Sequence, residues 1–246
     1  MNELSVIYED NHIIVVIKPQ NMPVCADESG DEDLLNQIKK YLAEKKNPRS
    51  ASEAVDGVDK ASAYCGLVHR LDRPTGGVMV FAKTSKSAAR LCEQIKDGIF
   101  QKTYLATVVG EPKLRAGTLV DHLLKNDARN TVEVVPSATA GAKRAELKYH
   151  VLETNKQVSL VEVKLITGRS HQARVQLKHL GCPIFGDAKY GGDKLGKGWN
   201  LALWAHELVF RHPTTEDMLK FIVNPPECVP WDSFVFDRKP KKRGAE

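Results

Sequence analysis

A short polar segment, LVHRLDRPTGG at residues 67–77, places an acidic side chain between two basic ones. Asp72 lies between Arg70 and Arg73, and apolar runs flank the segment on both sides. Pro74 and the glycines that follow favour a turn, which would hold the Asp72 carboxylate on a rigid loop at the end of a strand. A carboxylate kept ionised by neighbouring guanidinium groups could be a nucleophile, a base or half of a structural salt bridge.

A second polar cluster, TGRSHQAR at residues 167–174, is dense in hydrogen-bond donors. It holds Arg169, His171, Gln172 and Arg174 at an expected junction between a strand and a helix. At such a junction, backbone N–H groups and positive side chains can converge on an anion. The alternative is an exposed helix start that only meets water. Both clusters follow glycine-containing turns at strand ends, so one cleft could take both.

A tyrosine is the third candidate. Tyr104 lies in KTYLATVVG at residues 102–110, a run rich in β-branched residues that predicts a strand. Its ring would share a face with Ala106 and Val108, as expected of an ordinary core tyrosine. Beside a carboxylate and an arginine, the same ring would be a platform on which a flat substrate stacks. The local pattern leaves both interpretations open.

The elements that must position these residues follow from the hydrophobic periodicity. Helices are expected at residues 33–46, 84–98 and 170–181. Strands are expected at residues 4–8, 13–18, 102–110, 119–124, 131–135, 145–153, 158–166 and 201–210. Without a regular βαβ alternation, this order predicts an α+β fold with one large mixed, mostly antiparallel sheet and flanking helices.

Composition narrows the class of protein. The chain has 246 residues, of which 42% are hydrophobic, enough for one large domain with a core, which we favour, or for two small domains. No apolar run approaches the roughly 18 to 20 residues that cross a bilayer. The acidic start MNELSVIYED lacks the basic and apolar regions of a signal peptide. We therefore expect a soluble, cytoplasmic protein.

The cysteines and histidines do not have the spacing of a metal site. The 5 cysteines are scattered and none forms a C-x-x-C pair, which argues against a disulfide framework and a zinc ribbon. His206 and Glu207 begin an H-E-x-x-H pattern, but Phe210 stands where the second histidine should be. We expect no metal.

Five segments together resemble one family. HRLDRPTGGVMVFAKT resembles the H-R-L-D-x-x-T-S-G signature of the RluA-type pseudouridine synthases. The other segments, which resemble the family in the same order, are VIYEDNHIIVVIKPQNMPV, KTYLATVVG, TGRSHQARVQLKHLGCPIFGDAKYG and LALWAHELVFRHPTTEDM. They cover most of residues 5–226, and such an ordered series is far more specific than a lone H-R-L-D.

The resemblance implies an RNA-uridine isomerase with a mixed sheet, a central basic cleft and no cofactor or metal. Asp72 matches the catalytic aspartate, Tyr104 the tyrosine that stacks on the target base and assists proton removal, and Arg169 the arginine that pairs with the aspartate. Arg70 matches the signature arginine, expected to occupy the space of a flipped base. The other candidate substrate-binding or RNA-binding residues are His69, His171, Gln172, Arg174 and Leu203.

The resemblance also implies a domain organisation and a partner. We expect a single catalytic domain at residues 1–236, without the small S4-type RNA-binding module that precedes it in many relatives. The net charge of +5 permits a polyanionic partner, and the partner implied is RNA, either rRNA or tRNA, bound by a monomer. The basic tail at residues 237–246 is more often a solvated end than a binding arm.

Two other functions compete with this interpretation. One is a catalytically inactive RNA-binding protein or chaperone that uses the same basic cleft. The other is a glycoside or nucleoside hydrolase, which needs a second carboxylate near Asp72. Asp187 is the best-placed candidate, although the surrounding FGDAKYG favours a turn residue. The sequence leaves open whether Asp72 attacks the base, attacks the sugar or removes a sugar proton.

Overall fold

The computed structural model describes residues 4–46, 63–155, 157–191 and 196–236. The chain divides into two compact units. Unit 1 comprises Met1–Phe100 and Val209–Leu219, and unit 2 comprises Gln101–Leu208 and Lys220–Glu246. The predicted basic tail at 237–246 lies outside the described residues.

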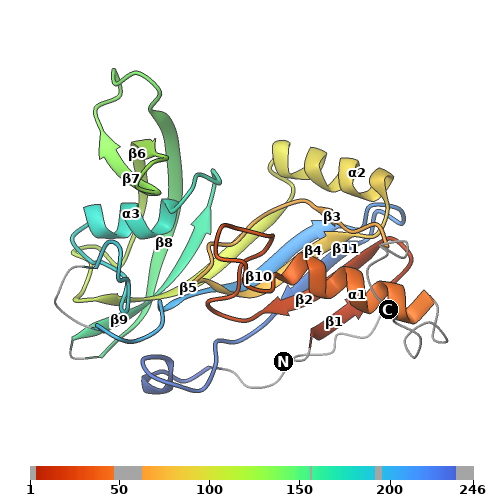
Figure 1. Cartoon of the computed structure of the whole chain (residues 1–246). Helices are drawn as coiled ribbons and strands as arrows, with labels where there is room; N and C mark the ends of the chain where they lie inside the picture. The colour runs from red at the N-terminus through yellow and green to blue at the C-terminus, as the bar shows by residue number, and fades with distance from the viewer. Residues whose placement is uncertain (1–3, 47–62, 156, 192–195, 237–246) are drawn as a thin grey trace. The chain divides into compact units, whose positions relative to one another are not determined.

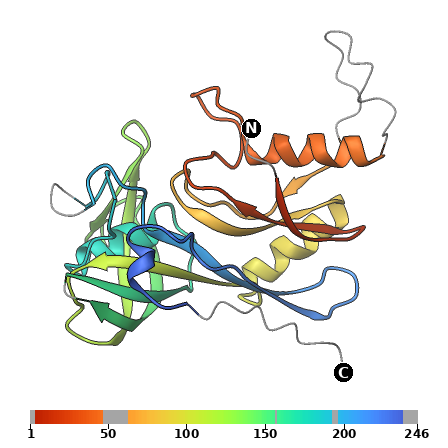
Figure 2. The same ribbon diagram turned by 90° about the horizontal axis from the view of Figure 1, so that it is seen from below.

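Unit 1 is a small antiparallel sheet with two helices (Figure 1). Its elements are β1 (Ser5–Glu9), β2 (Ile13–Lys18), α1 (Leu34–Lys46), β3 (Gly66–Leu67), β4 (Gly76–Ala82) and α2 (Ser85–Lys96). β2 lies between β1 and β4, and β3 also pairs with β4. In the view of Figure 2, β1 and β2 lie between α1 and α2.

The two central strands of this sheet are almost completely buried. Residues 13–16 in β2 and residues 78–82 in β4 are 0% exposed. Their continuous runs of apolar residues suit strands that are covered on both faces. The register pairs Lys18 with Gly77, so the end of β2 lies beside the start of β4. That start directly follows the segment that carries Asp72.

Side-chain caps fix where both helices of unit 1 begin. Asp33 Oδ1 accepts a hydrogen bond from the Asn36 backbone N–H at 2.9 Å, just before α1. Thr84 Oγ1 accepts one from the Ser87 N–H at 3.1 Å, just before α2. Such caps satisfy N–H groups that have no partner inside the helix. Both helices begin within a residue or so of the predicted starts.

A late stretch of the chain, Val209–Leu219, completes unit 1. The Arg211 backbone N–H donates to Gln94 Oε1 on α2 at 2.8 Å. His212 is buried, with 4% of its surface exposed, and its Nε2 lies 2.8 Å from Asp10 Oδ2. Two segments far apart in the sequence therefore build this unit.

Unit 2 contains most of the strands. Its elements are β5 (Gln101–Val109), β6 (Ala116–Asn126), β7 (Thr131–Val135), β8 (Lys143–Asn155), β9 (Val158–Leu165), α3 (Gln172–His179) and the 3-10 helix Trp231–Ser233. β10 (Leu203–Arg211) and β11 (Met218–Ile222) have residues in both units. The strand order is β10-β5-β9-β8-β6-β7, and the pairs among β5 to β9 are antiparallel.

The helix α3 packs on the β6–β7 side of this sheet (Figure 1). An apolar cluster joins the helix, the strands and the loop that follows. Its members are Leu123, Val132, Ala145, Val175 and Tyr190. This packing fixes α3, and with it the segment just before the helix that carries Arg169.

The α+β fold expected from the sequence is confirmed, with a many-stranded sheet and three α-helices among the described residues. Several boundaries differ by a few residues from the expected ones. In particular, α3 begins at Gln172 rather than near Ser170. His171 has a left-handed backbone with φ of 51°, which keeps it out of the helix. The single domain at residues 1–236 stays a prediction. No helix in the described ranges is long and apolar enough to cross a membrane.

Candidate active site

The segment that carries Asp72 forms the predicted turn between β3 and β4. The Asp72 carbonyl accepts a hydrogen bond from the Thr75 N–H at 2.9 Å, and Pro74 lies inside the turn. Leu71 and Thr75 are buried, whereas Asp72 is half-buried. Two buried anchors thus hold a carboxylate that still reaches the surface.

A buried lysine supports this turn from below. Lys18, at the end of β2, is 0% exposed. Its Nζ donates hydrogen bonds of 2.9 Å to the carbonyls of Pro19 and Arg73. Burial lowers the pKa of the ammonium to about 7, although the charge of Asp72 acts in the opposite direction. Lys18 therefore ties the turn to the sheet and brings positive charge toward Asp72.

Sequence reasoning missed Lys18. A signal was present, because a lysine that ends the apolar run IIVVI and precedes a proline is not where a solvated lysine is expected. The pattern did not show what Nζ would bind. The two acceptors come from Pro19, the next residue, and Arg73, 55 positions away.

One of the two arginines that flank Asp72 is also tied to another loop. Both arginines were expected to keep the Asp72 carboxylate ionised. The Arg73 guanidinium donates to Ser29 Oγ at 2.9 Å and forms ion pairs with Asp27 and Asp31. Arg70 is exposed. Arg73 therefore braces the loop after β2 against the turn, and the role of Arg70 stays a prediction.

His69 supports the strand rather than meeting solvent. It is 8% exposed, and its Nε2 accepts a hydrogen bond from the Val80 backbone N–H at 3.2 Å. Its ring packs against Phe100 with a centroid distance of 5.3 Å. Because Nε2 is an acceptor, the neutral ring carries its proton on Nδ1. The contact of His69 with RNA stays a prediction.

In unit 2, Tyr104 is buried in β5 and lies opposite Val163 of β9. Lys102 lies two residues earlier on the same strand, so the two side chains share a face. Its Nζ is 3.5 Å from the point that a Cβ on Gly168 would occupy. Burial lowers the pKa of this ammonium. Tyr104 therefore stands beside a cation that sequence reasoning did not single out.

The loop before α3 is held by a buried amide. Gln172 is 2% exposed, and its Oε1 accepts from the Arg169 N–H at 3.0 Å and from Thr167 Oγ1 at 2.8 Å. Its Nε2 donates to the Glu146 carbonyl at 3.0 Å. Arg169 is exposed, and its Nε donates to the Arg144 carbonyl at 3.1 Å. Gln172, predicted to bind RNA, thus fixes the backbone that presents Arg169.

Arg174 was predicted to bind RNA, but its guanidinium forms an ion pair with the buried carboxylate of Asp187. Nε and Nη2 donate to the two carboxylate oxygens of Asp187 at 2.9 and 2.7 Å. The two side chains are 6% and 1% exposed, and the guanidinium stacks on Tyr190.

His171 is half-buried, with Nδ1 2.6 Å from the Tyr190 hydroxyl. Leu203 is buried, with 4% exposed.

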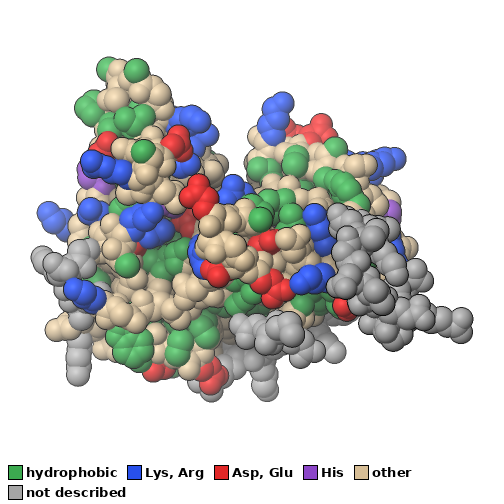
Figure 3. Space-filling view, viewed as in Figure 1, with side chains coloured by type: hydrophobic (Ala, Val, Ile, Leu, Met, Phe, Trp, Pro, Cys, Tyr) green, Lys and Arg blue, Asp and Glu red, His purple; other side chains and the backbone are tan. Residues whose placement is uncertain are grey.

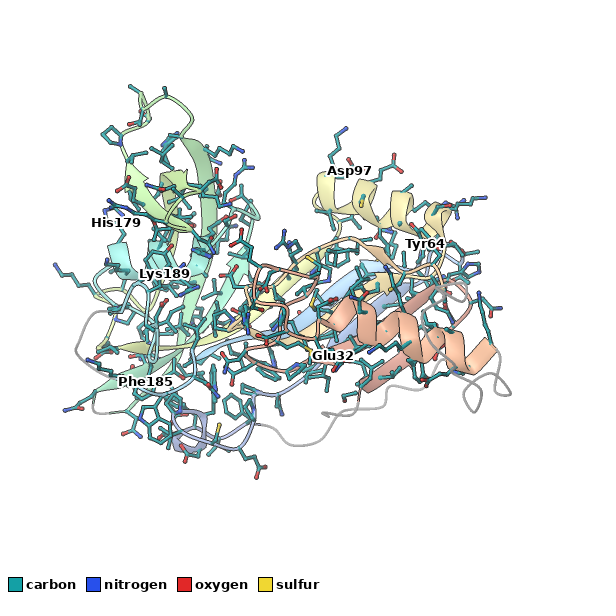
Figure 4. The ribbon with its side chains drawn as sticks, in the orientation of Figure 1. Glu32, Tyr64, Asp97, His179, Phe185 and Lys189 are labelled. Carbon is teal, nitrogen blue, oxygen red and sulfur yellow. The ribbon has the colours of Figure 1, made fainter. Side chains whose placement is uncertain are left out.

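The surface of unit 2 carries exposed cations around the buried contacts of α3. Lys and Arg side chains are spread over the face with α3 and β8 (Figure 3). Figure 4 labels His179 at the end of α3 and Lys189 in the loop that passes beside it. In the described part of the chain, no three His, Cys, Asp or Glu side chains gather as in a metal site.

The structure thus divides the three chemical residues. Asp72 lies in unit 1 with Lys18 at its turn, whereas Tyr104 and Arg169 lie in unit 2. The first group offers a fixed carboxylate that could act as a nucleophile or a base. The second offers an aromatic ring and positive charge for a flat, anionic substrate. The one cleft that would hold all three stays a prediction.

Comparisons with known proteins agree on one family. A model described as RNA pseudouridylate synthase matches residues 12–179. The chain is 33% identical over 221 residues to the ribosomal large subunit pseudouridine synthase C of Vibrio vulnificus, a match covering 87% of this chain and 64% of that protein. It is 33% identical over 233 residues to the ribosomal large subunit pseudouridine synthase D of Zymomonas mobilis, covering 91% of this chain and 70% of that protein.

Solved structures give the same result. The human protein called RNA pseudouridylate synthase domain containing 4 has a TM-score of 0.71 at 26% identity, and the match covers 90% of this chain and 88% of that one. The chain spans 64% of the length of the Vibrio relative. The matched family region contains Asp72, Tyr104 and Arg169.

Proposed function

Because the chain belongs to the RNA pseudouridylate synthase family, we propose that it isomerises specific uridines in RNA to pseudouridine. The observation that carries the proposal is the position of Asp72. It lies inside the matched region, on a turn that the buried Lys18 ties to the sheet. A carboxylate that must meet a sugar or base at one place needs such a rigid support.

The reaction places clear demands on the site. The glycosidic bond between N1 and C1′ breaks, and a bond between C5 and C1′ forms. The C5 proton leaves and N1 gains a proton, so the composition of the nucleotide is unchanged. A stacked uridine cannot present these atoms, so the enzyme must extrude the nucleotide and hold the free base until it rejoins.

The three chemical residues fit these demands. Asp72 attacks the base, attacks the sugar or removes a sugar proton, and each of these routes requires its ionised form. Tyr104 stacks on the extruded base and assists the loss of the C5 proton. Arg169 pairs with the carboxylate of Asp72 and holds it in the charged state.

The RNA is rRNA or tRNA. The matched relatives from Vibrio and Zymomonas are named for the large ribosomal subunit, so large-subunit rRNA is the first substrate to test. We further propose that the protein acts in the cytoplasm as a monomer, without metal or cofactor. Gel filtration and turnover in the presence of a chelator test the last two statements.

The decisive experiment replaces the carboxylate. Asp72→Asn keeps the size of the side chain, so the variant should fold, bind RNA with unchanged affinity and form no pseudouridine. Asp97→Asn, at the end of α2 in the same unit, is the matched control and should turn over like the wild type. Pseudouridine mapped by mass spectrometry after incubation with rRNA gives the readout, and turnover of the Asp72 variant above background would refute the role of Asp72.

The same experiment separates the alternatives. A catalytically inactive RNA-binding protein would bind RNA and form no pseudouridine even as the wild type. The hydrolase loses support from the structure, because Asp187, its candidate second carboxylate, is buried and accepts two hydrogen bonds from Arg174. No observation favours it.

A further inference from the structure

Lys102 of unit 2 has no role in the reaction proposed above. Lys102 is only partly exposed on β5, and burial is the one influence that shifts its pKa, in the downward direction. Among the described residues it has neither a carboxylate nor a hydrogen-bond acceptor as partner. A partly buried ammonium without a partner opposes folding, because water that solvated it has been removed. An anion that arrives with a ligand would offset this cost.

The geometry around Gly168 keeps this ammonium accessible. Gly168 does not have a positive φ, so its backbone conformation does not require glycine. A methyl group at this position would lie 3.5 Å from Lys102 Nζ, in ordinary contact. A larger side chain that extends in the same direction would reduce the space beside the ammonium. Glycine therefore leaves open the side of Lys102 that faces the loop of Arg169.

The neighbouring groups indicate which anion would bind. Tyr104 shares a face of β5 with Lys102, and side chains two residues apart on a strand are about 7 Å apart. A nucleotide whose base stacks on Tyr104 carries its charged phosphates within reach of such a side chain. Lys102 has no carboxylate partner among the described residues, so the RNA backbone is the source of negative charge that the proposed function supplies. An ammonium binds a phosphate oxygen as a point charge without demanding one orientation.

We propose that Lys102 binds one phosphate group of the RNA strand beside the target uridine. The proposal rests on the proposed function, which supplies the RNA and the stacked base. It gives Lys102 a binding role that is separate from the chemistry of Asp72.

The first test measures RNA affinity at several salt concentrations. Lys102→Met keeps the length of the side chain and removes the charge. Loss of one phosphate contact should reduce the slope of log K against log salt by roughly 0.7 to 0.9 and weaken binding at low salt about tenfold. Gly168→Ala keeps every charge but covers Nζ with a methyl group, and should weaken binding in the same direction by a smaller factor.

Lys164→Met is the matched control. Lys164 lies on the adjacent strand β9 opposite Thr103, so its side chain is on the other face of the sheet from Tyr104. It is exposed and faces Glu162 at 3.5 Å. This variant should keep the wild-type salt slope. An equal loss of slope in both variants would mean that lysines contribute only general positive charge, which would overturn the specific site.

A second test identifies the phosphate. RNA oligonucleotides with a single neutral methylphosphonate at successive positions remove one charge at a time. One position beside the target uridine should weaken binding of the wild type and have no further effect on Lys102→Met. Additive losses at every position would show that Lys102 binds no particular phosphate and would refute the proposal.

The stability of the free protein gives an independent readout. Lys102→Met removes a poorly solvated charge, so its melting temperature without RNA should rise, whereas loss of a structural lysine would lower it. The two proposals fail in different ways. A wild type that forms no pseudouridine refutes the proposed function, even if Lys102→Met still loses RNA affinity. A wild type that turns over beside a Lys102→Met variant with unchanged salt slope refutes the phosphate site alone.

Discussion

The turn of Asp72 and the loop of Arg169 are both fixed by one buried side chain, but these side chains differ in charge. Lys18 holds the turn through two backbone carbonyls, whereas the neutral Gln172 holds the loop through the Arg169 N–H and the Glu146 carbonyl. A cation beneath a carboxylate favours its ionised form. A cation beneath the Arg169 loop would instead repel the guanidinium of Arg169. The support of each loop therefore matches the charge that the loop presents.

The largest effect on stability is expected at the buried ion pair of Arg174 and Asp187. Arg174→Ala would leave Asp187 buried without its partner, which should lower the free energy of unfolding by about 3 to 5 kcal/mol. Denaturant unfolding measures the loss. The control is Arg144→Ala, which removes an exposed ion pair with Glu146 and should change stability by less than about 1 kcal/mol.

The Arg174→Ala variant also decides between two roles for Arg174. A residue that only supports the fold would leave RNA affinity unchanged when binding is measured on the folded fraction. If the folded variant loses both affinity and one unit or so of the salt slope, Arg174 contacts a phosphate as the sequence predicted, and the buried pair would have to open when RNA binds.

The charged support of the Asp72 turn should appear as a pH dependence. The pKa of Lys18 is about 7 in the folded protein and near 10.4 in the unfolded chain. Between these values the unfolded chain binds more protons, so stability should rise with pH by up to about 1.4 kcal/mol per pH unit. Lys18→Met removes this dependence. The stability of the wild type should therefore increase relative to that of the variant from pH 7 to pH 9.

Lys40→Met provides the comparison for this experiment. Lys40 is on α1 of the same unit and is exposed, with a salt bridge to Glu32 at 3.2 Å. Its stability curve should run parallel to that of the wild type between pH 7 and pH 9. Parallel curves for the Lys18 variant as well would show that Lys18 keeps an ordinary pKa, and the contrast between a charged and a neutral support would lose its basis.

The neutral support gives the smallest expected effect. Gln172→Glu keeps the acceptor for the Arg169 N–H but loses the donor to the Glu146 carbonyl, and should lower stability by about 1 to 3 kcal/mol. Gln94→Glu is matched, because Gln94 also accepts from a backbone N–H and donates to a carbonyl, both of Arg211, but at an exposed position. Equal losses in thermal unfolding of the two variants would mean that burial of Gln172 is unimportant.

Much of the fold could be predicted because its signals are local. Asp33 and Thr84 cap helices close to the starts that the apolar spacing predicted, and the β-branched runs form strands. The turn at Asp72 followed from Pro74 and the glycines. These features depend on the preference of a few neighbouring residues, which a sequence displays directly.

The candidate site could be predicted only in part, because its supports depend on distant contacts. Spacing placed Arg174 one turn into a helix, but whether that face meets solvent or Asp187 depends on how the next loop returns. The burial of Lys18 likewise depends on Arg73 across the sheet. The shift of the start of α3 to Gln172 reflects the left-handed backbone of His171, a conformation that its residue type does not announce.

The construction of unit 1 from two separate stretches has a consequence for the order of synthesis. Residues 1–100 leave the ribosome long before Val209–Leu219, which supplies His212 to Asp10 and Arg211 to Gln94. Synthesis of the intervening unit takes on the order of 10 s at ordinary rates. During that interval β2 and β4 can pair, but His212, which contacts Asp10 in the finished unit, has not yet been made. The half of the protein that carries Asp72 is therefore made first and completed only after most of the other half has been synthesised.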